Sequence, residues 1–256
     1  MVKRGKKAQV AIFVIIALVI VAAVIIIFLY PRISEFVAPA PVAPEGYLES
    51  CLQPVVKANV ALLASQGGYK NPEGFITYNG TKVKYLCYTS KYYETCSVQQ
   101  PMIVTHFAEE LAGLLKPEAE KCADSLKADY ERRGYEVSMS GVRTNISLAP
   151  GKVVISFTAP MTILKEDVKR TFEKFDVGIK SNIYDLMSIA TSIVEFEAYY
   201  GDSETTTYIQ YYPDLRIYKI KTEDGSKIYI VSDIITDEKF VFASRSLVWP
   251  AGYGGV

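Results

Sequence analysis

The sequence predicts an α+β fold in which an N-terminal transmembrane helix precedes an extracytoplasmic domain of amphipathic helices packed on an antiparallel sheet, with two disulfides. Residues 10–30 contain no charge, proline or glycine, which is the pattern of a helix that crosses a bilayer. Beyond them, segments of helical and of strand-like periodicity occur in separate blocks, which favours an α+β class. All four cysteines also lie beyond the apolar run, so they can pair in an oxidising compartment.

The apolar run follows a cluster of four basic residues, Lys3, Arg4, Lys6 and Lys7. About 20 helical residues span the roughly 30 Å of a hydrocarbon core, so we predict a transmembrane helix over residues 9–30. Because basic flanks stay in the cytoplasm, the prediction is a single-pass protein of the cell membrane with a cytoplasmic N-terminus and an extracellular C-terminal domain. A cleaved secretory signal would have a shorter apolar core of about 7–15 residues. An uncleaved signal anchor is the simplest alternative.

Lys6-Lys7-Ala8-Gln9, followed at once by the apolar run, resembles the class III signal peptides of archaeal type IV pilins and archaellins. The resemblance implies that residues 1–8 are a basic cytoplasmic leader, which a prepilin peptidase removes between Ala8 and Gln9. Pilins commonly carry a glutamate a few residues into the helix, whereas this chain is apolar after Gln9. The missing carboxylate disfavours filament assembly, so a pilin-like subunit and a tethered domain both stay open.

Residues 31–46 are rich in proline and alanine and predict an extended linker, because alternating prolines favour polyproline II. Residues 47–256 are numerous enough for one large domain or two small ones. Taking the four N-terminal basic residues from the total of 28 leaves 24, against 28 acidic residues. The domain has no basic stretch suited to phosphate backbones, so we predict no nucleic-acid partner.

Segments of the domain with the apolar spacing of amphipathic helices are residues 47–66, 101–133, 182–199 and 203–212. In the first of them, Pro54 fits only within a first turn, so the helix is expected to start several residues after Tyr47. In the second, the residue before Pro117 should avoid helical angles. We therefore expect two helices there, separated at Lys116-Pro117.

Segments that alternate as strands do are residues 142–148, 153–158, 161–169, 171–179, 216–221, 227–232 and 240–244. The last three predict a meander, because Asp224-Gly225 between alternating runs is a strong hairpin signal. Residues 69–100 are expected to be irregular or short-stranded, and they are rich in tyrosine.

Four cysteines allow three disulfide pairings. Cys87 and Cys96 bracket a short loop that a bridge would close, which leaves Cys51 and Cys122 to join two helices. Since a Cys51–Cys122 disulfide would close the longer loop, it should raise the free energy of unfolding by about 4 kcal/mol in the chain-entropy model. A zinc site is the weaker alternative, because no Cys-x-x-Cys occurs and His106 is the single histidine. We predict two disulfides, with no metal and no cofactor.

Two Asn-x-Ser/Thr sequons, at Asn79 and Asn145, are candidate glycosylation sites. They agree with an exported surface, although such sequons are common by chance.

Catalytic motifs are largely missing from the sequence. It contains no Gly-x-Ser-x-Gly elbow, glycine-rich phosphate loop or His-Glu-x-x-His, and a catalytic triad would have to use His106. A glycosidase pair or a cation site could come from the carboxylates Asp185, Glu195, Glu197, Asp202 and Glu204. Solvated helix faces and caps explain these residues more simply, so a non-enzymatic role is favoured.

Tyrosine is abundant, at 19 of 256 residues. Its ring offers rigid amphipathic area that suits binding surfaces and sugar stacking, although tyrosine also packs well on half-buried sheets. We predict a binding loop made of Tyr88, Tyr92 and Tyr93, between Cys87 and Cys96. Trp249, the single tryptophan, is expected either to dock on the core or to be exposed for a partner.

Three segments carry a resemblance over most of the chain: Tyr-Leu-Cys-Tyr-Thr at 85–89, residues 190–202, and Ala-Ser-Arg-Ser-Leu-Val-Trp-Pro at 243–250. Together with the N-terminus, they look similar to uncharacterised membrane-anchored proteins of small-genome archaea, which implies an origin but no activity.

The sequence therefore predicts a pilin-like cell-surface protein with a binding or assembly role. Its expected partners are the lipid bilayer and either like subunits of a surface filament or a cell-surface protein or glycan. The alternative is an anchored extracytoplasmic hydrolase that acts on glycans or peptides through a carboxylate pair.

Overall fold

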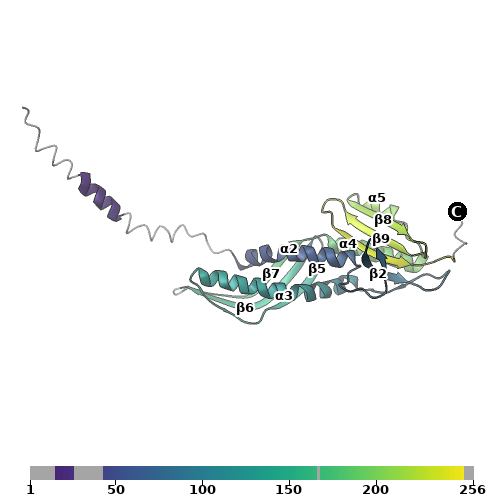
Figure 1. The fold of residues 1–256 in the computed structure, drawn as a ribbon, viewed down its shortest axis with the longest axis horizontal. Helices are drawn as coiled ribbons and strands as arrows, with labels where there is room; N and C mark the ends of the chain where they lie inside the picture. The colour runs from purple at the N-terminus through teal and green to yellow at the C-terminus, as the bar shows by residue number, and fades with distance from the viewer. Residues whose placement is uncertain (1–14, 26–42, 166–167, 251–256) are drawn as a thin grey trace, which may run out of the picture. The chain divides into compact units, whose positions relative to one another are not determined.

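The computed structural model describes residues 15–25, 43–165 and 168–250, drawn as a ribbon in Figure 1. The chain divides into two compact units, one ending at Val42 and one running from Ala43 to Val256. In the first unit, residues 15–25 form a helix of 11 residues.

The prediction of a transmembrane helix over residues 9–30 was wrong. Eleven helical residues rise about 16 Å, whereas a span needs about 30 Å. Within residues 15–25, 43–165 and 168–250, no helix has both the length and the apolar character needed to cross a bilayer. The expected leader at 1–8, its cleavage positions Ala8 and Gln9, and the linker up to residue 42 lie outside the described residues.

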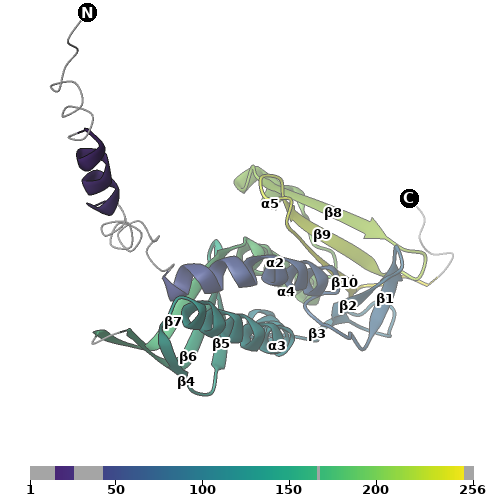
Figure 2. The ribbon, with the colours of Figure 1, turned by 60° about the vertical axis from the view of Figure 1, so that its left-hand side comes forward.

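The second unit begins with two long helices, α2 at Pro44–Ser65 and α3 at Ile103–Arg132. The start of α2 falls inside the segment expected to be linker. The two helices lie side by side in Figure 2, and the Cys51–Cys122 disulfide joins them with a Cα–Cα distance of 6.0 Å. The second disulfide, Cys87–Cys96, has a Cα–Cα distance of 5.4 Å. Both predicted pairings are confirmed.

Each long helix continues through a proline, so the expected start near Leu52 or Gln53 and the expected break at Lys116-Pro117 were wrong. A proline inside a helix removes one backbone hydrogen bond to the carbonyl four residues earlier. Both prolines are exposed, and so are Ser50 and Gly113, which carry the freed carbonyls. Water can reach these carbonyls, while burial of the opposite face of each helix stabilises it on both sides of the proline.

A six-stranded sheet contains β1 (Phe75–Tyr78), β2 (Thr81–Tyr88), β3 (Ser97–Val98), β8 (Leu215–Lys221), β9 (Lys227–Asp233) and β10 (Lys239–Arg245). Its order is β1-β2-β10-β9-β8, with β3 paired to β2. The predicted meander of β8, β9 and β10 is confirmed. However, β2 pairs with β10 in parallel, so the expectation of a wholly antiparallel sheet was wrong.

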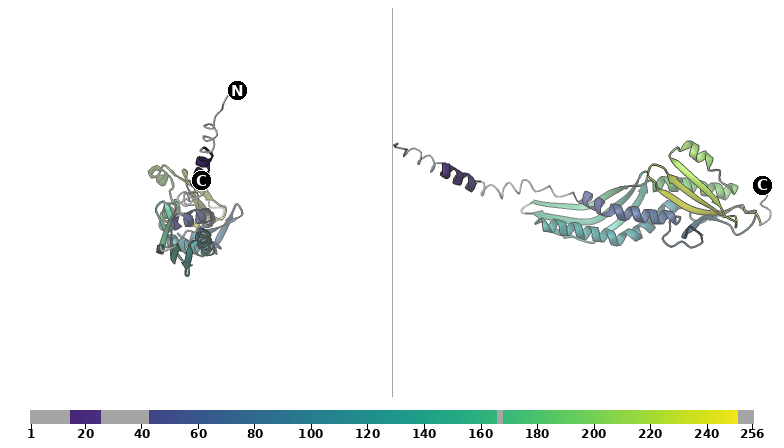
Figure 3. Two further views of the ribbon diagram at one scale, coloured as in Figure 1. Left: turned by 90° about the vertical axis from the view of Figure 1, so that its left-hand side faces the viewer. Right: turned by 45° about the horizontal axis from the view of Figure 1, so that its top comes forward.

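The other sheet contains β4 (Glu136–Met139), β5 (Arg143–Ala149), β6 (Lys152–Lys165) and β7 (Val168–Lys180). All its pairs are antiparallel, and β4 and β5 both pair with β6. The strands predicted at 153–158 and at the start of 161–169 are one long strand, β6, which forms a hairpin with β7 alongside the long helices in Figure 3.

Two further helices, α4 (Ile183–Tyr200) and α5 (Thr206–Tyr211), follow the predicted spacing. α4 packs on β9 and β10, α3 packs on β4 and β5, and α2 contacts both β7 and β10. The main core lies between these helices and the two sheets, with Phe107, Phe157, Phe240 and Phe242 almost fully buried. The carboxyl end of α4 and the end of β10 thereby meet beside the Cys87–Cys96 loop.

Candidate functional site

The loop predicted to bind a partner follows β2 and is closed by the Cys87–Cys96 disulfide. Its three tyrosine side chains are accessible: Tyr88 is 38% exposed, Tyr92 49% and Tyr93 50%. The closed loop thus presents large rings to solvent, as the sequence predicts.

The chain that leaves β10 runs beside this loop and holds it through the backbone. Thr89 N–H donates to the carbonyl of Arg245 at 3.0 Å, and Tyr93 N–H donates to that of Val248 at 2.9 Å. In the other direction, Leu247 N–H donates to the carbonyl of Glu94 at 2.8 Å. These bonds join two segments far apart in the sequence into one support.

Side chains from both segments interlock on this support. The rings of Tyr93 and Trp249 meet edge to face, with centroids 5.0 Å apart, and Trp249 is 56% exposed. The Arg245 guanidinium lies 5.7 Å from the centroid of the Tyr92 ring and donates a 2.6 Å hydrogen bond to the carbonyl of Thr89. Tyr88, Tyr92, Tyr93 and Trp249 are called the aromatic surface below.

The backbone beneath the aromatic surface adopts uncommon angles. Among the described residues, Tyr93 and Leu247 are two of the four non-glycine residues with positive φ, at 60° and 48°. Such conformations are costly for residues with a Cβ and persist where the surroundings enforce them. Tertiary contacts therefore hold the loop and the tail in place.

Two glycines explain how the tail fits against the rest of the sheet. A Cβ built at Gly201 would lie 2.5 Å from Cβ of Leu247, and one at Gly225 would lie 2.3 Å from Cγ1 of Val248. Both glycines also have positive φ, at 85° and 81°. Only glycine meets both requirements, so the tail passes over the end of α4 and the β8–β9 turn in close contact.

A hollow of about 260 Å³ opens beside Trp249. Its lining includes Asp202, Lys221 and Glu223 together with Leu247 and Val248. The Lys221 ammonium lies 3.6 Å from the Asp202 carboxylate. An aromatic surface thus borders a small recess that carries hydrogen-bonding groups of both charges.

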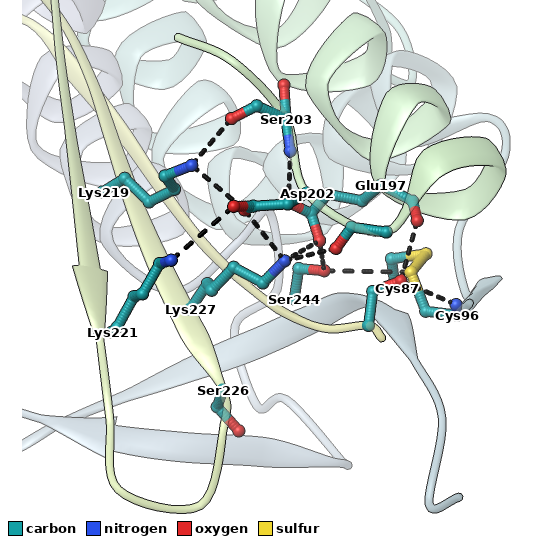
Figure 4. A network of polar contacts seen from close by, with 12 residues as sticks. Cys87, Cys96, Glu197, Asp202, Ser203, Lys219, Lys221, Ser226, Lys227 and Ser244 are labelled. Carbon is teal, nitrogen blue, oxygen red and sulfur yellow. Dashed lines mark hydrogen bonds and ion pairs between the residues drawn. A yellow bond between two sulfur atoms is a disulfide. The ribbon is translucent and has the colours of Figure 1, made fainter. Parts of the chain in front are cut away.

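Below the recess, Glu197 of α4 forms the centre of a buried polar network (Figure 4). Its side chain is 0% exposed and accepts hydrogen bonds from Lys227 Nζ at 2.7 Å and from Ser244 Oγ at 3.0 Å. It also accepts from the Ser203 amide at 2.9 Å and from the Tyr229 hydroxyl. Four donors therefore compensate the buried charge, as burial of a carboxylate requires.

Lys227 extends this network toward the recess. Its ammonium donates to the carbonyl of Gly201 at 2.5 Å and to Asp202 Oδ1 at 3.1 Å. Burial by itself would raise the pKa of the Asp202 carboxyl, yet hydrogen bonds from Lys219 and Lys227 hold that pKa below its ordinary value. Asp202 is thus ionised at neutral pH and lies within ion-pair distance of three lysines, Lys219, Lys221 and Lys227.

Ser246 connects the network to the aromatic surface. Its hydroxyl donates to the backbone carbonyl of Glu197 at 2.7 Å and accepts from the Cys96 amide at 2.9 Å. One buried side chain therefore bonds the end of α4, the tail and the disulfide loop together. The aromatic surface is fixed from below as well as through its own backbone.

We expect this network to make stability depend on pH above the ordinary tyrosine range. Burial, and then the charge of Glu197, raise the pKa of the Tyr229 hydroxyl well above 10. The unfolded chain loses this proton above pH 10 while the folded chain retains it, so the free energy of unfolding should fall as pH rises, by about 1.4 kcal/mol per pH unit.

Urea titrations between pH 9 and 11 on wild type and Tyr229→Phe test this dependence. The variant lacks the ionisable hydroxyl, so its stability should decline less steeply than that of wild type over this range. Equal slopes for the two proteins would contradict the assignment.

The candidate carboxylates separate into different roles. Glu197 and Asp202 both bond Lys227, and the charge of Asp202 also acts on the Glu204 carboxyl. Asp185 accepts from the Gly151 amide at 3.2 Å, and Glu204 accepts from the Thr206 amide at 2.9 Å. Glu195 is exposed on α4. Since Glu197 is fully buried and its oxygens are already bonded, Glu197 and Asp202 form no carboxylate pair open to a substrate.

His106 lies on α3 and lines neither the aromatic surface nor its recess. Its ring centroid is 4.0 Å from that of Tyr69, and burial lowers the pKa of its imidazole. Among the described residues its Nε2 has no hydrogen-bond partner, although Glu110 Oε1 lies 3.8 Å away.

The described part of the chain contains no group of three or more His, Cys, Asp or Glu side chains that could hold a metal ion. Both sequon asparagines, Asn79 and Asn145, are exposed.

Sequence reasoning missed Lys227, Tyr229, Ser244 and Ser246. One usable signal was present, because alternation in β9 puts Lys227 and Tyr229 on the same face as the core residue Val231. A lysine on an inward face implies a buried partner of opposite charge.

No family model, curated protein or solved structure matches the chain.

Proposed function

We propose that this protein is an exported, non-enzymatic binding protein that recognises a surface glycan through its aromatic surface. The observation that carries the proposal is the presence of three rings, those of Tyr92, Tyr93 and Trp249, each about half exposed on one rigid support. Aromatic faces stack on the C–H faces of sugar rings, and polar groups alongside can bond the hydroxyls. The recess with Asp202 and Lys221 supplies such groups.

Two features support export. The chain forms two disulfides and has no free cysteine, and disulfides persist in oxidising compartments. The exposed sequons at Asn79 and Asn145 agree with that environment. The pilin-type leader and its cleavage stay predictions. The hydrolase alternative is not favoured, because Glu197 is sealed from solvent.

Trp249→Ala is expected to weaken glycan binding by about thirtyfold, which corresponds to the loss of roughly 2 kcal/mol that truncation of an aromatic anchor causes. Tyr92→Ala should weaken it as well, because that ring is 49% exposed on the same bridged loop. The measurement is a screen of the full-length protein on immobilised polysaccharides, followed by calorimetry with the oligosaccharide that binds best.

Tyr211→Ala is the matched control. Tyr211 is a tyrosine of α5 that is 78% exposed, and it belongs neither to the aromatic surface nor to the lining of the recess. It should leave the affinity unchanged. Equal losses for Trp249→Ala and Tyr211→Ala, or no binding to any glycan in the screen, would overturn the proposal.

A further inference from the structure

A second hollow, of about 590 Å³, lies away from the aromatic surface and shares no lining residue with its recess. It is bordered by the second half of α2, the start of α4 and the turn between β9 and β10. Its volume falls within the range of small-molecule sites, about 300–1,000 Å³.

The floor of this hollow is apolar. Val60 and Ala64 of α2 and Ile183 of α4 line it, and each is almost fully buried against the core. Ala61, on the next position of α2, is exposed at its wall. Since the floor is already almost buried, an apolar ligand body would gain dispersion contacts with it and would remove the exposed Ala61 from water, and both effects favour binding.

Three lysines, Lys57, Lys180 and Lys239, line the same hollow from three different elements. All three are exposed, and across the described residues no ion pair or side-chain hydrogen bond is found for their ammonium groups. Elsewhere in the chain, Lys219, Lys221 and Lys227 are all paired with carboxylates. The three lysines thus line the hollow without forming an ion pair with a carboxylate of the described residues.

The acidic residues of the hollow only partly offset these charges. Glu238 accepts a hydrogen bond from the backbone amide of Asn182, at the start of α4, so its carboxylate is already bonded. Asp237 lies in the β9–β10 turn and is exposed. A bond from a neutral amide leaves the charge of Glu238 in place, so three lysines against two carboxylates give the lining a formal charge of +1.

We propose that this hollow binds a small amphipathic anion, with its apolar body on the Val60–Ala64–Ile183 floor and its carboxylate among the three lysines. The charge complementarity of the rim and the apolar character of the floor each select one end of such a ligand. The inference is independent of the glycan proposal, because the two sites share no residue.

Three probes with the same apolar body test the selection by charge: 4-phenylbutanoate, 4-phenylbutanol and 4-phenylbutylamine. Each is titrated into the ¹⁵N-labelled full-length protein, with the amide signals of Ala61, Ala64 and Asn182 as readout. The carboxylate should bind about tenfold more tightly than the alcohol, because three exposed charge contacts act together. The amine should bind most weakly. Equal affinities, or tightest binding of the amine, would overturn the proposal.

Variants separate the two parts of the site. Lys57→Gln, Lys180→Gln and Lys239→Gln should each weaken 4-phenylbutanoate about threefold and leave 4-phenylbutanol unchanged. Lys116→Gln is the control, since Lys116 is an exposed lysine on α3 that does not line the hollow. Ala61→Trp should abolish binding of all three probes by filling the space. If the triple lysine variant binds 4-phenylbutanoate as wild type does, the proposal fails.

Discussion

Replacing Glu197 with alanine is expected to lower the free energy of unfolding by about 3 kcal/mol, because the buried Lys227 keeps only Asp202 and the Gly201 carbonyl as partners and the Tyr229 hydroxyl loses its acceptor. The stranded groups would be Lys227, which is 5% exposed, and Tyr229, which is 0% exposed. Since domains are typically stable by about 5–15 kcal/mol, this single change removes a large part of the total. Urea unfolding at pH 7, followed by far-UV circular dichroism, measures it.

Glu195→Ala is the matched control, because Glu195 lies two residues away on the same helix and is exposed. It should change stability by less than about 0.5 kcal/mol. The double variant Glu197→Gln/Lys227→Met should be less destabilised than the sum of its single changes, since the pair is removed together. A loss below 1 kcal/mol in Glu197→Ala would contradict the role assigned to the network.

Removing the Cys51–Cys122 disulfide is expected to cost about 4 kcal/mol, because it closes a loop of 71 residues in the unfolded chain. The Cys87–Cys96 disulfide closes only nine residues, and its removal should cost about 3 kcal/mol. The variants are Cys51→Ala/Cys122→Ala and Cys87→Ala/Cys96→Ala, compared in the same urea titration.

Glycan binding distinguishes the two disulfides further. The Cys51–Cys122 bridge joins α2 and α3, so the folded fraction of its variant should bind with wild-type affinity. The Cys87–Cys96 bridge closes the loop that carries Tyr92 and Tyr93, so its variant should bind weakly even when folded. If the first variant alone lost binding, the assignment of the site to the bridged loop would be wrong.

Features that depend on neighbouring residues could be predicted from the sequence. The β8–β9–β10 meander follows from alternation and from the Asp224-Gly225 turn. α4 follows from its helical spacing, and the Cys87–Cys96 bridge follows from the short loop between the two cysteines. The positions of Tyr92 and Tyr93 in an exposed loop could be anticipated for the same reason.

Features that depend on distant residues could not be predicted. The parallel pairing of β2 with β10 brings Thr89 and Arg245 together across 156 residues, and no local pattern encodes such a contact. Glu197 was interpreted as part of a solvated helix face, because its partners Lys227 and Ser244 come from strands formed much later in the chain. The effect of Pro54 and Pro117 was also mispredicted. Proline disfavours a helix interior locally, but burial of one face of α2 and of α3 stabilises each helix on both sides of its proline.

The parallel β2–β10 pair has a consequence for biogenesis. Translation adds about 5–20 residues per second, so β2 is complete well before its neighbour β10 exists. The nascent chain must therefore carry β2 with an open edge until residues 239–245 have been made. Contacts of such high sequence separation slow folding and lengthen exposure to aggregation. The sheet can therefore be completed only in a late step, after β10 has been made.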